Sequence, residues 1–270
     1  MNWKKLIIGE WSWKRPFYTV AWVYLLLAVF AFFFADKLIF QPPGTPYPLD
    51  QTHFTILPDD EETIAIYHRP ARPGMPTILW SHGNAQNLGT LHRVLDDLAN
   101  RGYGALSYDY PGYGFSSGKP SEKGCYRAIE STYQHALTTL EIPPTNLILV
   151  GQSVGSGPTC WLAARQEHHS VVLLSPFLSA FRTVTHIPLF LGDRFPNVKN
   201  ITEFSTPLLI VHGEEDQVIP FKQGEQLFNI SPSKEKKFIP IPGAGHNDLF
   251  LHSSFDLTTL IQGELWERQP

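Results

Sequence analysis

Cysteine is scarce in this sequence, and no pattern of metal-binding side chains stands out. The 270 residues include two cysteines, Cys125 and Cys160, with no CxxC motif and no Cys/His spacing typical of zinc. We interpret both thiols as buried core residues. A disulfide between them is the alternative, and it requires a domain that faces an oxidising compartment. The pattern predicts no metal site.

The sequence also lacks a concentrated positive charge and any low-complexity segment. The formal net charge is −4 and no basic stretch stands out, so we do not expect nucleic acid as a partner. The 20 glycines and 23 prolines are spread along the chain. Hydrophobic residues make up 43% of the sequence, which is enough for one sizeable α/β core.

One long apolar run is present near the N-terminus. Residues 17–35, "FYTVAWVYLLLAVFAFFFA", carry no charge and are long enough to cross a hydrocarbon core of roughly 30 Å. The preceding segment 1–16 is a basic flank. By the positive-inside rule, we expect a cytoplasmic N-terminus and an extracytoplasmic remainder, which in a bacterium would lie in the periplasm. The basic residues of the flank are Lys4, Lys5, Lys14 and Arg15.

Two other interpretations of this run remain. A cleaved signal peptide has an apolar region of about 7 to 15 residues and a small-x-small cleavage site. The run is longer than that, and its best cleavage candidate, Val29-Phe30-Ala31, lies inside it. A buried core helix is the other alternative, although such a uniformly apolar core helix is uncommon. We therefore predict an uncleaved membrane anchor.

A proline-rich segment follows the anchor. Residues 36–51 include "QPPGTPYPLD", in which the prolines exclude a helix, and we interpret them as a linker. Residues 52–270 form the predicted domain. Its short apolar runs alternate with helical patterns, which indicates a mostly parallel sheet with helices on both faces. The expected strands are 53–57 and 63–69, as an antiparallel pair, then 76–82, 104–110, 147–150, 171–174, 208–211 and 238–241.

Residues 176–205 interrupt this alternation. The segment is too long for a simple connection and is rich in Phe, Leu and Ile. We interpret it as a short cap over the strand ends. A surface helix pair with no role in substrate binding is an equally weighted alternative.

The pattern Gly151-Gln152-Ser153-Val154-Gly155 carries the main chemical prediction. It follows the strand-like run "LILV" and opens a helical pattern, which is the context of a nucleophile elbow. Flanking glycines remove side chains that would clash in such a tight turn. Ser153 is therefore the predicted nucleophile.

An activated serine needs a base, and the base needs an orienting acid. In this fold the chain order is Ser, acid, His. The run "LLIVHGEEDQVIP" places Asp216 after a strand, and "PIPGAGHNDLF" does the same for His246. We predict Asp216 as the acid and His246 as the base. Other candidates are Glu214 and Glu215 for the acid, and His168, His169, His186 and His252 for the base.

Two backbone N–H groups are expected to form an oxyanion hole. One belongs to Val154, the residue after the nucleophile, and the other comes from the loop after an early strand. The segment "WSHGNAQN" supplies that loop, and Asn84 is the predicted donor in it.

Five motifs together resemble the α/β-hydrolase fold over about residues 52–260: "SHGNA", "SYDYPGYGFSSGKPSE", "GQSVGSGPT", "HGEEDQVI" and "GAGHNDL". They are most similar to the Bem46-like branch and the α/β-hydrolase-domain-containing protein 17 group. The resemblance implies a serine hydrolase of acyl esters or thioesters that needs no cofactor, with Ser153, Asp216 and His246 as catalytic residues. That group includes enzymes that remove palmitate from proteins. Its members attach to membranes through an acylated cysteine-rich N-terminus, whereas this chain has no cysteine before Cys125.

The predicted function is thus a membrane-anchored serine hydrolase with an acyl ester or thioester substrate, on a lipid or an acylated protein. A serine aminopeptidase-like enzyme is one alternative, and Asp193 or Glu203 in the cap would then hold the substrate amine. A non-catalytic, membrane-tethered binding protein is another. The last alternative is a haloperoxidase or a dehalogenase on the same fold. The dehalogenase is disfavoured because its nucleophile is a carboxylate, whereas the predicted nucleophile here is a serine.

Overall fold

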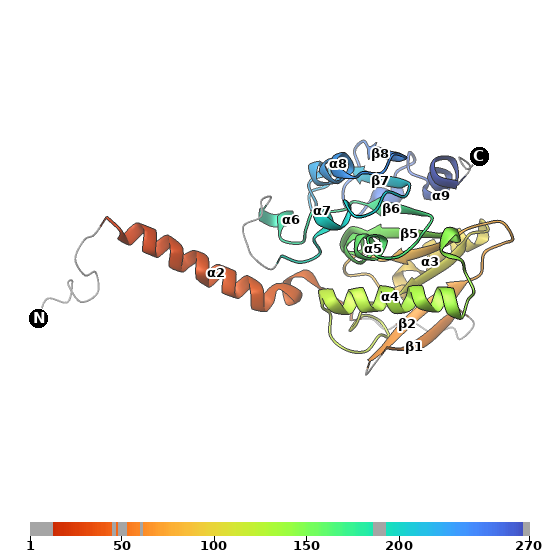
Figure 1. The fold of residues 1–270 in the computed structure, drawn as a ribbon, viewed down its shortest axis with the longest axis horizontal. Coiled ribbons are helices and arrows are strands. Elements are labelled where there is room, and N and C mark those ends of the chain that lie inside the picture. Colours follow the sequence, from red (N-terminus) through yellow and green to blue (C-terminus); the bar gives the residue numbers. More distant parts are fainter. Residues whose placement is uncertain (1–12, 45–46, 48–52, 60–61, 186–192, 267–270) are drawn as a thin grey trace, which may run out of the picture.

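The computed structural model describes residues 13–44, 47, 53–59, 62–185 and 193–266. It consists of an α/β domain from which one long helix, α2 (Arg15–Ile39), projects to one side (Figure 1). The predicted fold class is confirmed: a mostly parallel sheet is flanked by helices on both faces.

The sheet has eight strands in the order β1-β2-β4-β3-β5-β6-β7-β8. The contacts of β2 with β1 and with β4 are antiparallel, and all other neighbours are parallel. The strands are β1 (Phe54–Asp59), β2 (Glu62–Arg69), β3 (Thr77–Ser81), β4 (Gly104–Tyr108), β5 (Leu147–Gln152), β6 (Ser170–Leu174), β7 (Leu208–Gly213) and β8 (Lys236–Ile241).

Both faces of the sheet are buried, which explains the continuous apolar runs. In β5, Leu147 and Leu149 join the core cluster on one face, and Ile148 and Val150 join the cluster on the other. The first cluster includes residues of α4 and α5, and the second includes residues of α3 and α9. Strand side chains alternate between faces, so a strand covered on both sides needs apolar residues at every position.

The helices of the domain are short apart from two. α3 begins after Asn87, whose side chain accepts a hydrogen bond from the Thr90 N–H. The helices are α3 (Leu88–Asn100), α4 (Glu122–Thr138), α5 (Ser156–Ala163), α6 (Arg182–Thr185), α7 (Asn197–Asn200), α8 (Phe221–Ile230) and α9 (Leu257–Ile261), with 3₁₀ turns at Pro144–Asn146, Ser153–Gly155 and Leu249–Leu251 and a π turn at Gln262–Trp266.

The segment 176–205, interpreted above as a cap, is irregular and has little helix. Its described part contains α6 and α7, and residues 186–192 lie outside the described residues. The cap is attached to the domain by side chains: Gln223 of α8 accepts from the Leu178 N–H at 2.9 Å and donates to the Arg182 carbonyl at 2.8 Å.

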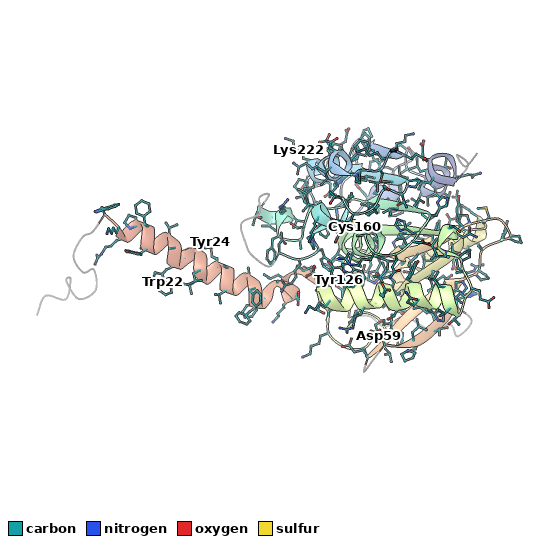
Figure 2. The ribbon with its side chains drawn as sticks, in the orientation of Figure 1. Trp22, Tyr24, Asp59, Tyr126, Cys160 and Lys222 are labelled. Carbon is teal, nitrogen blue, oxygen red and sulfur yellow. The ribbon has the colours of Figure 1, made fainter. Side chains whose placement is uncertain are left out.

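α2 is longer than the expected span 17–35 and continues through the first residues of the expected linker. An 18-residue window of it has a mean hydropathy of 2.2, and none of that window is buried within the structure. Trp22 and Tyr24 lie on the part of α2 that is remote from the domain (Figure 2). By length and composition α2 is a candidate membrane span, and a signal sequence has the same properties.

The two cysteines are buried and free, as expected for core thiols. Cys125 belongs to α4 and Cys160 to α5. Burial raises the pKa of both thiols, so neither is activated as a nucleophile.

Truncating a residue of the central strand tests the two-sided core. Leu149 is 0% exposed, so we expect Leu149→Ala to lower the free energy of unfolding by about 2–5 kcal/mol, through lost burial and the remaining cavity. Leu251 is 83% exposed, and Leu251→Ala is the control, with an expected change within about 0.5 kcal/mol. Denaturant titrations in detergent measure both. Equal losses would contradict the assigned core.

Candidate active site

Ser153 lies in a strained turn at the carboxyl end of β5. Its φ is +53°, a left-handed conformation that a non-glycine residue adopts at a cost of about 1–3 kcal/mol. The flanking glycines explain how the turn fits. A Cβ on Gly151 would lie 2.8 Å from the Gly155 carbonyl oxygen, and a Cβ on Gly155 would overlap the Ser81 carbonyl oxygen. The turn therefore requires glycine at both positions.

Ser153, His246 and Asp216 are brought together from three different strand ends. The Oγ of Ser153 lies 2.9 Å from Nε2 of His246. The Nδ1 of His246 lies 2.7 Å from Oδ2 of Asp216. The three side chains thus form one hydrogen-bonded series, although they are separated by 93 and 30 positions along the sequence.

Asp216 is held in a buried position by several donors. Its Oδ1 accepts from the N–H groups of Val218 at 2.9 Å and Ile219 at 2.7 Å. Burial alone would raise the pKa of this carboxyl, but hydrogen bonds from His212, His246 and the Ile219 N–H lower it far below its usual value. Asp216 is therefore ionised at neutral pH and accepts hydrogen bonds with both oxygens.

The competing bases and acids occupy other places. His168 bonds to the Gln166 carbonyl and the Thr206 hydroxyl, and His169 contacts the Ser170 hydroxyl. Glu214 and Glu215 are exposed. His252 lies 3.8 Å from Asp248, and His186 lies outside the described residues.

The loop after β3 lies next to Ser153. Asn84 and Val154 both border the cavity that contains the Ser153 hydroxyl. Ala85 has a φ of +54°, so this loop is a second strained turn facing the same space. The two predicted oxyanion donors thus border the same cavity as Ser153.

The cavity around Ser153 has a volume of about 800 Å³. Its described lining contains no Asp, Glu, Lys or Arg, and His246 is its one titratable side chain. Apolar side chains come from the cap, from the loop after β7 and from α2. Those residues are Leu27, Phe30, Ala31, Leu38, Ile39, Phe177, Phe181, Val184, Val218 and Ile219. The site is suited to an uncharged, apolar ligand.

Comparison with known proteins identifies the domain. A family model described as the alpha/beta hydrolase fold matches residues 76–200, and a model described as serine aminopeptidase S33 matches residues 191–250. The chain carries an α/β-hydrolase domain. The sequence is 38% identical to alpha/beta hydrolase domain-containing protein 17C of Mus musculus over 199 residues, which cover 73% of this chain and 62% of that protein.

A second relative and a solved structure extend the comparison. Alpha/beta hydrolase domain-containing protein 17B of Homo sapiens is 41% identical over 182 residues, covering 66% of this chain and 63% of that protein. The chain thus spans less than two thirds of the length of these curated relatives. The fold matches that of a Pyrococcus furiosus esterase with a TM-score of 0.67 at 14% identity, over 85% of this chain and 98% of that one.

His212 is a site residue that the sequence analysis missed. It is fully buried in β7 of the α/β-hydrolase domain, and its Nε2 lies 3.3 Å from Asp216 Oδ2 and 3.0 Å from the Ile219 carbonyl oxygen. Gly224 leaves space for this ring, since a Cβ there would lie 2.5 Å from Nδ1. The only signal in the sequence is the spacing of four residues between His212 and Asp216 in "HGEED". This spacing does not show that the His212 ring points toward Asp216.

A buried pair, His82 and Asp109, supports the Asn84 loop of the hydrolase domain from behind. His82 Nδ1 lies 2.8 Å from the Gly83 carbonyl, and its Nε2 lies 3.6 Å from Asp109 Oδ1. Asp109 accepts from the Tyr47 hydroxyl at 2.6 Å and from the Leu88 N–H at 2.8 Å. Burial lowers the pKa of His82 to about 4 and raises that of Asp109 to about 6.

The described residues contain no group of three or more His, Cys, Asp or Glu side chains arranged to hold a metal ion.

The raised pKa of Asp109 predicts a pH-dependent difference between the protein and its Asp109→Asn variant. The folded protein binds this proton up to about pH 6, whereas the unfolded chain releases it near pH 3.9. The protonated Asp109 therefore makes its full contribution to the free energy of unfolding below about pH 4. That contribution is lost as the pH rises through 6. Between pH 4 and 7, we expect the free energy of unfolding of the wild-type protein to fall by on the order of 2–3 kcal/mol relative to that of the variant. Denaturant titrations at each pH measure this difference. A constant difference over this range would contradict the assignment.

Proposed function

We propose that the chain is a membrane-anchored serine hydrolase that cleaves acyl ester or thioester bonds. Ser153 is the nucleophile, His246 the general base, and Asp216 the acid that orients it. The N–H groups of Asn84 and Val154 form the oxyanion hole. The observation that carries this proposal is the hydrogen-bonded series Ser153–His246–Asp216, which opens into an apolar cavity at a strained strand-to-helix turn.

The proposed reaction follows from this geometry in two steps. Ser153 Oγ attacks the acyl carbonyl carbon while His246 Nε2 takes its proton, and the oxygen that becomes negative is bound by the two N–H groups. The alcohol or thiol leaves with the proton from His246, and an acyl-serine remains. Water then attacks the acyl-serine, with His246 again acting as the base, and releases the acid. Each N–H donor is worth about 3 kcal/mol of barrier by analogy with measured oxyanion donors.

The role of Asp216 is electrostatic and positional. Its hydrogen bond to Nδ1 fixes the tautomer in which Nε2 of His246 accepts the serine proton. Because the carboxylate stays ionised well below neutral pH, it also stabilises the imidazolium that forms during attack.

Peptidase activity is the alternative that the match to serine aminopeptidase S33 brings forward. That reaction needs a carboxylate to hold the amino group of the substrate. Asp193 accepts from the Ser179 hydroxyl at 2.5 Å and from the Phe181 N–H at 2.8 Å, and it does not border the cavity. Glu203 is exposed and also lies outside it. The lining therefore favours an acyl group over a charged amine.

The membrane role of α2 belongs to the same proposal. The helix has the length and composition of a span, and the basic residues that precede it in the sequence favour a cytoplasmic N-terminus. The hydrolase domain would then lie on the extracytoplasmic side. Acylated proteins of the cytosol would be out of reach there, which makes protein depalmitoylation of the cytosolic type an unsuitable role for this chain.

Activity-based labelling tests whether Ser153 is activated. We expect a fluorophosphonate probe to label the detergent-solubilised protein, because His246 lies within hydrogen-bond distance of Oγ, and we expect no labelling of Ser153→Ala. Ser254→Ala, at an exposed serine, is the control and should label like wild type. If the folded wild-type protein and Ser153→Ala both remain unlabelled, the site is not a serine hydrolase and the non-catalytic binding role is favoured.

Replacing Asp216 tests the hydrogen-bonded series as a unit. We expect Asp216→Asn to lower kcat for a soluble acyl ester by about 10³- to 10⁴-fold, because His246 loses its orientation and its counter-charge. Glu215→Gln removes the adjacent, exposed carboxylate and should leave kcat within about twofold of wild type. Steady-state kinetics on 4-nitrophenyl acetate separate the two variants. Similar losses in both would argue against Asp216 as the specific acid.

A further inference from the structure

One face of α2 forms part of the wall of the cavity that contains Ser153. Leu27, Phe30, Ala31 and Leu38 all border this cavity. Their spacing of three, four and eleven residues from Leu27 places them on the same side of a helix. The helix that is apolar enough to span a membrane is thus also a boundary of the proposed active site.

α2 is joined to the domain at its C-terminal end by packing and by an ion pair. Ala35 and Phe40 are buried, and the Phe40 ring lies 6.0 Å from that of Phe195. Arg194 of the cap forms an ion pair with Asp36, with 3.2 Å between Nε and Oδ1. These contacts fix the direction in which the helix leaves the domain, so its lining face has a defined position.

The same end of α2 is bonded to the loop of the proposed oxyanion hole. Asn84 Nδ2 donates to the Ile39 carbonyl at 2.6 Å, and Asn84 Oδ1 accepts from the Gln41 N–H at 2.9 Å. The Tyr113 hydroxyl donates to the same Oδ1 at 2.8 Å. The position of the Asn84 backbone therefore depends on where α2 ends.

The wall that faces α2 is made by the cap and the loop after β7. Phe181, Val184 and Val218 border the cavity, and the last two are 80% and 53% exposed. Figure 1 shows α6, which carries Val184, on the side of the domain from which α2 projects. Exposed apolar side chains at the mouth of a cavity are unfavourable in water and favourable in lipid.

The helix geometry gives the depth in the membrane at which the cavity opens between α2 and α6. Asp36 and Lys37 are the first charged residues after the apolar run and mark the polar boundary of a span. Leu27 lies nine residues before Asp36, which is about 13 Å along the helix axis. With Asp36 at the membrane surface, the gap between α2 and α6 would open into the hydrocarbon layer itself.

We propose that α2 is a substrate-binding element, and that the acyl chain of a membrane lipid ester enters laterally from the bilayer, between α2 and α6, to reach Ser153. This inference rests on the proposed function and assigns its substrate class. Leu27 and Phe30 are then residues that determine specificity for a long acyl chain.

A lipid is favoured over an acylated protein by the chemistry of the opening. A polypeptide drawn into it would bring backbone N–H and carbonyl groups to membrane depth, where each unpaired group costs several kcal/mol. The lining side chains of α2 are apolar, and α6 contributes Val184 and two threonines, Thr183 and Thr185. A single acyl chain needs no polar partner until its ester group reaches Ser153.

The test compares two double variants of the full chain in phosphatidylcholine nanodiscs. Leu27→Ala/Phe30→Ala alters the lining face, and Leu26→Ala/Phe33→Ala makes the same change of composition on residues that do not border the cavity. 1-Palmitoylglycerol in the nanodisc is the long-chain substrate, and 4-nitrophenyl acetate is the soluble short-chain substrate. An S-palmitoyl peptide in the same nanodiscs tests the protein-derived source. Fluorophosphonate labelling of Ser153 is recorded for every variant.

We expect the lining variant to lose about tenfold or more in kcat/KM for palmitoylglycerol and at most about threefold for 4-nitrophenyl acetate, with the control variant equal to wild type for both substrates. The proposal is overturned if both double variants lose palmitoylglycerol activity equally, if neither does, or if acetate hydrolysis falls in parallel. Wild-type cleavage of the peptide without cleavage of the lipid would also overturn it. In each of those cases, fluorophosphonate labelling of Ser153 in the wild-type protein would leave the serine hydrolase function standing, whereas an unlabelled wild type would remove both proposals.

Discussion

The tight turn at Ser153 is the constraint on which the rest of the site depends. Strand β5 ends at Gln152 and helix α5 begins at Ser156, so the chain must change direction within the three residues Ser153–Gly155. The reversal succeeds because two glycines pack against each other and against β3, and because Ser153 accepts a positive φ. The strain directs the Ser153 side chain out of the sheet, toward His246.

The other site residues are held by the same edge of the sheet. Asp216 follows β7 and His246 follows β8, so parallel pairing alone carries both to the end where Ser153 lies. Burial of Asp216 would favour its neutral form, but three donors reverse that preference. The ionised form of Asp216 is therefore favoured by the Ile219 N–H and by the rings of His212 and His246.

Much of this organisation was readable in the sequence because it depends on local patterns. Continuous apolar runs indicated strands covered on both faces, and all the expected strands are present in the sheet. The segment from Gly151 to Gly155 indicated a strand-to-helix turn, since glycine pairs around a serine are needed where side chains have no space. The motif order placed Asp216 and His246 next to strand ends, and the structure joins His246 to Ser153 and Asp216 to His246. The apolar composition of α2 was equally clear from its uncharged run, although the helix extends beyond that run at both ends.

Tertiary structure alone decided the contacts between segments that no local pattern relates. His212 lies against Asp216 because β7 turns its ring inward and Gly224 leaves space for it, and neither fact follows from spacing. Asn84 bonds to the end of α2 across more than forty positions. A uniformly apolar run has no periodicity that marks one side of the helix. The contacts of Phe40 and Asp36 with the domain orient α2, and this orientation alone decides which of its faces lines the cavity. The sequence by itself indicated the candidate site residues and the apolar helix, and packing decided that the two share one cavity.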